Sequence, residues 1–353
     1  VISDPTVQNP TATNVANGEV FTVIITAASG LSDSCTVIAE VFDLPACEAV
    51  NNGPICMGDE LQLDEIGGEA ISWSWSSDGG AVISDPTIQN PTATDVSNGE
   101  IFTVVITDQN GCTSTCTTVV EVFDEPVCNA TIDGPICSGE TLVLNEDGGS
   151  AVSWMWSTDG GALIDDPAAQ SPTATGVSDG ETFTVMITDA NGCVSSCSVT
   201  ATVNALPGCN AGNDGPICEG DDLGLSEDAG DAISWQWSTD GGAVIDDPTA
   251  QNPTATNVSN GETFTVIVTD ANGCTDTCTT IVEVFDLPVC NAENDGPICE
   301  GDELGLSENG GAAVSWSWSS DGAAVIDDPT AQNPIATEVS NGEIFTVVIT
   351  DAN

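Results

Sequence analysis

The sequence consists of a repeat without insertions, and this repetition restricts the fold more than any other feature. The phrase GPIC recurs at a constant spacing, and its cysteines are Cys56, Cys137, Cys218 and Cys299. We therefore expect one small domain for each 81-residue period. The expected segments are a partial repeat at 1–46 (the C-terminal part of a unit), complete repeats at 47–127, 128–208 and 209–289, and a partial repeat at 290–353 that lacks its last strand. Because residues 1–29 correspond to residues 325–353, we also expect the sequence to be a window on a longer array.

Hydrophobic residues alternate with polar ones within each period, which is typical of strands with one face exposed to water. In AVSWMWS, Trp154 and Trp156 share one face, while Met155 points to the other. The pair Asn191-Gly192 is a strong hairpin signal. Roughly six or seven short strands in about 80 residues, with no helical period, predict an all-β fold of tandem immunoglobulin-like β-sandwich repeats in a rod-like array. We expect the first tryptophan of each W-x-W pair to fill the core, and the second to lie near the sheet edge: Trp73, Trp154, Trp235 and Trp316 are the expected core residues.

The charge of the chain excludes several classes of partner. It carries 56 carboxylate side chains and no lysine, arginine or histidine. Nucleic-acid binding rests on cationic side chains that displace counterions, and attraction to anionic lipid also needs basic segments. No apolar run approaches the length of a membrane span. We expect neither nucleic acid nor membrane insertion, but 40% hydrophobic residues with eight tryptophans are enough for a folded core.

The phrase from Trp237 to Cys274, WSTDGGAVIDDPTAQNPTATNVSNGETFTVIVTDANGC, resembles the PKD-like and immunoglobulin-like repeats of large secreted cell-surface proteins of Bacteroidota-type bacteria. The resemblance extends unit by unit over the whole chain. It implies PKD-like sandwiches that act as extracellular spacers, adhesin stalks or surface filaments, and no enzymatic activity. The chain departs from the pattern by lacking basic residues and by carrying four cysteines in each unit.

The cysteines are expected to form disulfides in an oxidising, extracellular compartment. Zinc is the alternative, but of the four cysteines between Asp270 and Cys299 only Cys274 and Cys278 have the spacing of a zinc knuckle, because Cys290 and Cys299 lie nine residues apart. A reactive thiolate would need a nearby cation or a helix N-terminus, and the chain has no cationic side chain. The disulfide candidates are Cys47, Cys56, Cys112, Cys116, Cys128, Cys137, Cys193, Cys197, Cys209, Cys218, Cys274 and Cys278.

The pairing of these cysteines is open between bridges within a repeat and bridges to the next repeat. Cys274 and Cys278 are about 13 Å apart along a strand, too far to bond to each other. Leu31 replaces the first cysteine of the C-x3-C pair in the first unit, whereas Cys47 and Cys56 after it are both present. This favours bridges within a repeat and predicts that Cys35, Cys290 and Cys299 have no partner. Bridges between repeats would instead connect neighbouring units twice.

Carboxylates near the linkers suggest a calcium site that would stiffen neighbouring repeats. The candidates are Asp286, Asp295, Glu300, Asp302 and Glu303, although no EF-hand type loop is present. Otherwise we expect no cofactor. We also expect no enzymatic activity, because a nucleophile needs a base and the chain has no histidine, lysine or tyrosine.

The sequence thus favours a structural component of an extracellular filament or cell-surface rod, in contact with neighbouring repeats and identical chains. One alternative is an adhesin module that binds sugar or protein through exposed aromatic rings. Another is a calcium-rigidified adhesin stalk. Exposure of the second tryptophan of each pair separates the first two hypotheses, because a buried ring offers no binding platform.

Overall fold

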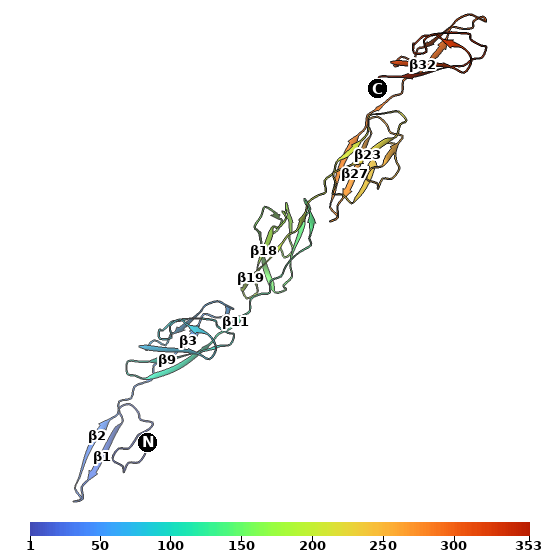
Figure 1. Cartoon of the computed structure of the whole chain (residues 1–353). Coiled ribbons are helices and arrows are strands. Elements are labelled where there is room, and N and C mark those ends of the chain that lie inside the picture. Colours follow the sequence, from blue (N-terminus) through green and yellow to red (C-terminus); the bar gives the residue numbers. More distant parts are fainter. The chain divides into compact units, whose positions relative to one another are not determined.

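The computed structural model describes residues 1–353, and every regular element in it is a β-strand. Figure 1 shows strands and loops in every part of the chain. The prediction of an all-β fold of tandem immunoglobulin-like sandwiches is confirmed.

Repeat 47–127 shows how one unit is built. Its strands are β3 (Ala49–Asn51), β4 (Ile55–Cys56), β5 (Leu61–Glu65), β6 (Ser72–Ser77), β7 (Val82–Ile83), β8 (Thr92–Thr94), β9 (Ile101–Thr107), β10 (Thr113–Val119) and β11 (Val122–Phe123). They form a four-stranded sheet in the order β3-β5-β8-β7, a three-stranded sheet in the order β10-β9-β6, and a short parallel pair of β4 with β11.

The other repeats reproduce these strands one or two periods further along the chain. The next unit contains β12 (Ala130–Ile132), β13 (Ile136–Cys137), β14 (Leu142–Glu146), β15 (Ala151–Thr158), β16 (Leu163–Ile164), β17 (Thr173–Thr175), β18 (Thr182–Asp189), β19 (Val194–Thr200) and β20 (Val203–Asn204). Repeat 209–289 contains β21 (Ala211–Asn213), β22 (Ile217–Cys218), β23 (Leu223–Glu227), β24 (Ser234–Thr239), β25 (Val244–Ile245), β26 (Thr254–Thr256), β27 (Thr263–Thr269), β28 (Thr275–Ile281) and β29 (Val284–Phe285).

The two partial repeats carry fewer strands. Segment 1–46 has β1 (Val20–Thr26) and β2 (Ser32–Ile38), which pair with each other. Segment 290–353 has β30 (Ala292–Asn294), β31 (Leu304–Glu308), β32 (Ser315–Ser320), β33 (Val325–Ile326), β34 (Ile335–Thr337) and β35 (Phe345–Thr350).

The core of repeat 47–127 lies between its sheets, where alternate residues of each strand point inward. Leu61 and Leu63 of β5 face Phe102, Val104 and Ile106 of β9, and all five are fully buried. Each of these side chains contributes roughly 1.5–3 kcal/mol when it leaves water. The central aliphatic and aromatic positions recur at the same register in repeat 209–289.

The structure corrects the expectation that the first tryptophan of each pair is the one that fills the core. The second tryptophan is the buried one, with 2–4% of its surface exposed: Trp75, Trp156, Trp237 and Trp318. The first tryptophan, expected to fill the core, is only partly buried: Trp73, Trp154, Trp235 and Trp316. Both rings point to the same face, where the second tryptophan belongs to the buried core cluster and the first packs against that cluster from a partly buried position.

The chain forms two compact units, one of Val1–Gly134 with Gly139–Thr202 and the other of Pro135–Ser138 with Val203–Asn353. The segment around Cys137 belongs to the second unit, where β13 pairs in parallel with β20. This GPIC segment therefore pairs with the strand that follows Thr202. The expected repeat boundaries stay a prediction.

Candidate functional site: the disulfide-linked junctions

Each complete repeat contains one internal disulfide between its two sheets. In the first complete repeat it joins Cys47, just before β3, to Cys116 on β10, with the Cα atoms 5.7 Å apart. The same bridge recurs as Cys128–Cys197 and Cys209–Cys278, always with a sequence separation of 69 residues. It therefore connects the first strand of the four-stranded sheet to the edge strand of the other sheet.

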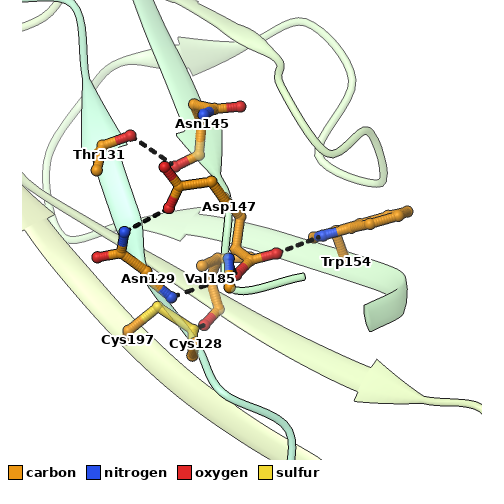
Figure 2. Close-up of a disulfide and its surroundings, with 10 residues drawn as sticks. Cys128, Asn129, Thr131, Asn145, Asp147, Trp154, Val185 and Cys197 are labelled. Atoms are coloured by element: carbon orange, nitrogen blue, oxygen red, sulfur yellow. Dashed lines mark hydrogen bonds between the residues drawn. A yellow bond between two sulfur atoms is a disulfide. The ribbon is translucent and has the colours of Figure 1, made fainter. Parts of the chain in front are cut away.

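Hydrogen bonds surround this internal bridge. Figure 2 shows Cys128–Cys197 beside Asn129, whose side-chain amide donates to Asp147. The backbone N–H of Asn129 donates to Glu146 over 3.2 Å, and the indole of Trp154 donates to the other oxygen of Glu146 over 3.0 Å. The half-buried tryptophan thus has a polar partner next to the disulfide.

A second type of disulfide joins neighbouring repeats. Cys56 in the first GPIC segment bonds to Cys193 of the following repeat, and Cys137 bonds to Cys274 in the same manner. Both pairs have Cα atoms 5.6 Å apart and a sequence separation of 137 residues. Cys193 and Cys274 are fully buried. Each of these junctions therefore has two covalent connections, the peptide linker and the bridge.

The GPIC end of this junction is positioned by the parallel strand pair. The N–H of Ile55 donates to the carbonyl of Glu121, and the N–H of Met57 donates to the carbonyl of Phe123. These bonds hold Cys56 between them at the end of its own repeat, where the following repeat begins.

The other end of the junction is positioned by the DANG hairpin. The carboxylate of Asp189 accepts the N–H groups of Asn191 at 2.9 Å and of Cys193 at 2.8 Å. Gly192 has a φ of 90°, which favours glycine at this turn position. The hairpin between β18 and β19 therefore holds Cys193 in a fixed place for the bridge. Asp270 makes the same pair of bonds for Cys274.

The preference for bridges within a repeat was half wrong, because the structure uses one bridge of each type. Cys112 and Cys218, both disulfide candidates, are free, as are Cys35, Cys290 and Cys299. A separation of 69 residues would place the partners of Cys35 and Cys290 outside positions 1–353. A separation of 137 residues does the same for Cys112, Cys218 and Cys299. The pattern of free thiols thus follows the repeat register.

Two sets of glutamates are buried in a chain that offers them no cation. Glu227 is 1% exposed and accepts the N–H groups of Asn210 at 3.2 Å and Ala229 at 2.9 Å, and the indole N–H of Trp235 at 3.0 Å. Neutral donors therefore take the place of a salt bridge. Sequence reasoning missed this role, although the glutamate and the tryptophan keep a constant spacing of eight residues: Glu65 with Trp73, Glu146 with Trp154, and Glu308 with Trp316.

The second set is Glu100, Glu181 and Glu262, which are buried, and the equivalent Glu343 of segment 290–353 is only partly buried. Glu262 accepts the hydroxyl of Thr239 at 2.6 Å and the N–H groups of Ala243 at 2.8 Å and Ser259 at 2.9 Å. Burial raises the pKa of Glu262, but these hydrogen bonds outweigh burial and hold the pKa below its ordinary value. Through these hydrogen bonds, the carboxylate connects the loop before β25 to the turn before β27.

The proposed calcium residues do not gather into a metal site, since no group of three or more acidic or cysteine side chains lies close enough to hold an ion. Asp295 accepts the N–H of Gly305 at 2.8 Å, and Asp302 accepts the N–H of Cys299 at 3.3 Å. Asp302 orders a local turn, and Asp295 joins the segment after β30 to β31. Asp286, Glu300 and Glu303 complete the candidate set, and calcium binding stays a prediction.

A cavity of about 650 Å³ lies in segment 290–353, between Ile298, Asn341 and Phe345. In repeat 209–289, the residue equivalent to Asn341 is Asn260, whose side chain accepts the N–H of Val284 on β29. The cavity therefore occupies the place that the last strands fill in a complete repeat.

The comparisons with known proteins add no assignment. No protein-family model and no curated protein matches the chain. Among solved structures, the human Desmocollin-1 ectodomain has 13% identity and a TM-score of 0.22 and covers 95% of this chain and 83% of its own. The ICAM-5 D1-D4 ectodomain fragment has 12% identity and a TM-score of 0.29 and covers 86% of this chain and 98% of its own. With scores this low, nothing about the function of those proteins is transferred. The chain has no helix of the length and hydrophobicity that a bilayer span requires.

Proposed function

We propose that this protein is a structural component of an extracellular filament or cell-surface array, in which disulfides transmit force from one immunoglobulin-like repeat to the next. The observation that carries the proposal is the second bridge type, Cys56–Cys193 and Cys137–Cys274. A protein whose repeats acted separately would need only the internal bridge for stability.

The bridges of both types combine into a continuous covalent path. From Cys193 the path runs four residues along the chain to Cys197, crosses to Cys128, runs nine residues to Cys137 and crosses to Cys274. It advances by one full repeat and uses only two short segments of extensible chain. Since the linker peptide carries tension as well, each junction has two load-bearing routes, and both bypass the sandwich bodies.

The alternative, an adhesin module that grips its ligand through tryptophan, has less support. Trp75, Trp156, Trp237 and Trp318 are buried and leave no aromatic platform. An enzyme is not proposed, because no histidine, lysine or tyrosine is present to act as a base. A surface protein of Bacteroidota-type bacteria, as the sequence resemblance implies, and an oxidising extracellular location are parts of the proposal.

The absence of lysine and arginine allows a direct test of the junction. Val127 lies exposed in the linker before Cys128, so the variant Val127→Arg introduces a single trypsin site. Cleavage should leave the oxidised protein as one covalent species, because Cys56–Cys193 spans the cut. Reduction should then release the pieces 1–127 and 128–353. The matched control, Val127→Arg with Cys193→Ser, should separate without reductant. Separation of the oxidised Val127→Arg protein would refute the double connection.

A further inference from the structure

The two cysteines of each junction bridge differ in their access to solvent. Cys193 and Cys274 are fully buried. Their partners in the GPIC segments, Cys56 and Cys137, are only partly buried. The internal bridges lack this asymmetry, because both of their cysteines are partly buried in each complete repeat. Solvent therefore reaches a junction bridge only from its GPIC end.

This asymmetry fixes the direction in which a thiol can open the bridge. In thiol–disulfide exchange, a thiolate bonds to one sulfur, the S–S bond breaks, and the other sulfur leaves with the electron pair. An external thiolate that approaches Cys56–Cys193 bonds to Sγ of Cys56, since that is the accessible residue. The leaving Sγ of Cys193 then takes up a proton from water. The products are a mixed disulfide on Cys56 and a free thiol at Cys193.

Carboxylates lie at both ends of this reaction. The N–H of Cys56 donates to Asp59 over 3.2 Å, and the N–H of Cys193 donates to Asp189 over 2.8 Å. Asp59 is thus next to the cysteine that is attacked, and Asp189 is next to the cysteine whose sulfur acquires negative charge. In the second junction, Asp270 accepts the N–H of the buried cysteine in the same way, over 2.8 Å.

The chain offers no compensation for this negative charge. A thiolate in a reactive site is normally stabilised by a neighbouring cation, a metal or a helix N-terminus. Here no side chain is cationic, and every regular element is a β-strand. Repulsion from Asp59 and Asp189 therefore slows attack by a thiol that brings further negative charge, and it hinders a positively charged thiol less.

We propose that Cys56 and Cys137 are modification sites for small external thiols, which open the junction bridges from the GPIC end, and that cationic thiols open them faster than anionic ones. The inference rests on the proposed structural function, because the bridge that opens is one of the two load-bearing routes. Opening is reversible, since the hairpin keeps Cys193 in place to displace the external thiol from Cys56. Neighbouring repeats are thus uncoupled and recoupled while the linker peptide stays intact.

Isotope labelling of the full, oxidised chain tests the direction of attack. N-ethylmaleimide first blocks the five free cysteines. Cysteamine is then added briefly, heavy-isotope N-ethylmaleimide stops the reaction, and mass spectrometry locates both labels. We expect cysteamine on Cys56 and the heavy label on Cys193, at least about tenfold more often than the reverse pattern. The internal bridge Cys128–Cys197 is the control, and each of its cysteines should carry either label.

The rate of opening tests the effect of charge. Cysteamine and 3-mercaptopropionate are compared at about 20 mM and about 500 mM NaCl, and each rate is divided by the rate of the same thiol with the uncharged 2-hydroxyethyl disulfide. This division removes the difference in intrinsic nucleophilicity between the two thiols. We expect cysteamine to open Cys56–Cys193 at least about threefold faster at low salt, and the difference to shrink at high salt.

A pair of variants assigns this effect to the two carboxylates. Asp59→Asn with Asp189→Asn keeps the accepting oxygens and removes the charges, so it should raise the rate with 3-mercaptopropionate about threefold or more. The matched control is Glu69→Gln with Asp231→Asn, which neutralises two exposed carboxylates that form no hydrogen bond with a cysteine. This control should open at the rate of the unmodified chain.

Three results would overturn the inference. Cysteamine distributed equally between Cys56 and Cys193 would contradict the directed attack. Equal normalised rates for the two thiols at low salt would contradict the role of the carboxylates. A junction bridge that stays closed while cysteamine opens Cys128–Cys197 would show that no thiol reaches it. The trypsin experiment at Val127 detects the oxidised bridge without any added thiol, so failure of the exchange site and failure of the covalent junction can be told apart.

Discussion

At the scale of single residues, the main chemical feature is the solvation of buried carboxylates by neutral donors. Glu262 and its equivalents accept a hydroxyl and two backbone N–H groups each, and this compensates for the loss of water without a cation. Three or more hydrogen bonds to an ionised carboxylate lower its pKa, as the structure indicates for Glu100, Glu181 and Glu262.

This leads to a prediction about acid stability. Because the pKa values of these glutamates are lower in the folded chain, the unfolded chain binds protons first as the pH falls. Their contribution to the free energy of unfolding is complete above the ordinary glutamate pKa of about 4.5 and declines as the pH falls toward the lowered folded value. The variant Glu100→Gln, Glu181→Gln, Glu262→Gln should be less stable than the parent chain at pH 7, and the difference should shrink at about pH 3.

Urea unfolding at several pH values measures this difference. Glu121→Gln at an exposed position serves as the control and should change little. At each pH, the free energy of unfolding of the parent chain is subtracted from that of the variant. This removes the effect of acid on the general charge repulsion, which both proteins share. A stability difference that does not depend on pH would contradict the assigned role of the three carboxylates.

At the scale of elements, the hairpin between β18 and β19 carries the cysteine that links its repeat covalently to the preceding one. Its tip carries Cys193, and Asp189 orders the turn through two backbone hydrogen bonds. A carboxylate that caps a turn in this way contributes about 1.5–3 kcal/mol for each charged hydrogen bond at most, less where water competes.

We expect Asp189→Ala to slow formation of the Cys56–Cys193 bridge and to leave a larger fraction of Cys193 open to alkylation during oxidative refolding. Asp189→Asn keeps the accepting oxygen and should restore most of the bridge. The internal bridge Cys128–Cys197 in the same repeat is the control, and its yield should be equal in all three proteins. Equal alkylation of Cys193 in all three proteins would show that the turn does not direct the pairing.

At the scale of the whole molecule, the two bridge types give tension two routes along the chain. One route follows the linkers and crosses each repeat at its internal bridge, such as Cys47–Cys116. The other passes from repeat to repeat at the junction bridges, such as Cys56–Cys193. Because both routes bypass the sandwich body between Cys56 and Cys116, the loss of either Cys47–Cys116 or Cys56–Cys193 leaves the other route past this repeat intact. Each disulfide also stabilises its repeat by about 2–4 kcal/mol.

Single-molecule stretching of the oxidised chain from its two ends tests these routes. Opening one internal bridge with Cys47→Ser, Cys116→Ser should leave the fully extended length almost unchanged, because Cys56–Cys193 still bypasses the same repeat. Adding Cys56→Ser and Cys193→Ser should then lengthen the chain by about 240 Å, since the 69 residues closed by the internal bridge are released at roughly 3.3–3.6 Å each.

The matched control for this experiment is Cys56→Ser, Cys193→Ser alone. It should also keep the extended length of the parent chain, because the internal bridge Cys47–Cys116 still closes the repeat. Release of about 240 Å on opening the internal bridge by itself would contradict the second route.

The repeat period, the strand alternation and the requirement for disulfides were predictable from the sequence, because each depends on residues near one another or on spacing along the chain. The constant step located every GPIC phrase, and the alternation in AVSWMWS put Trp154 and Trp156 on the inner face and Met155 on the outer face. The hairpin at Asn191-Gly192 followed from local turn chemistry in the same way.

Only the tertiary structure decided which cysteines meet and which tryptophan is buried. A disulfide requires two Cα atoms within about 7 Å, and this distance is unrelated to sequence separation once the chain folds. The absence of a cysteine at Leu31 was interpreted on the assumption of a single bridge type, whereas the structure uses separations of 69 and 137 residues side by side. Trp73 and Trp75 have the same alternation in sequence. Only the packing of their strand against the opposite sheet buries Trp75 in the core and leaves Trp73 partly buried, where it donates to Glu65.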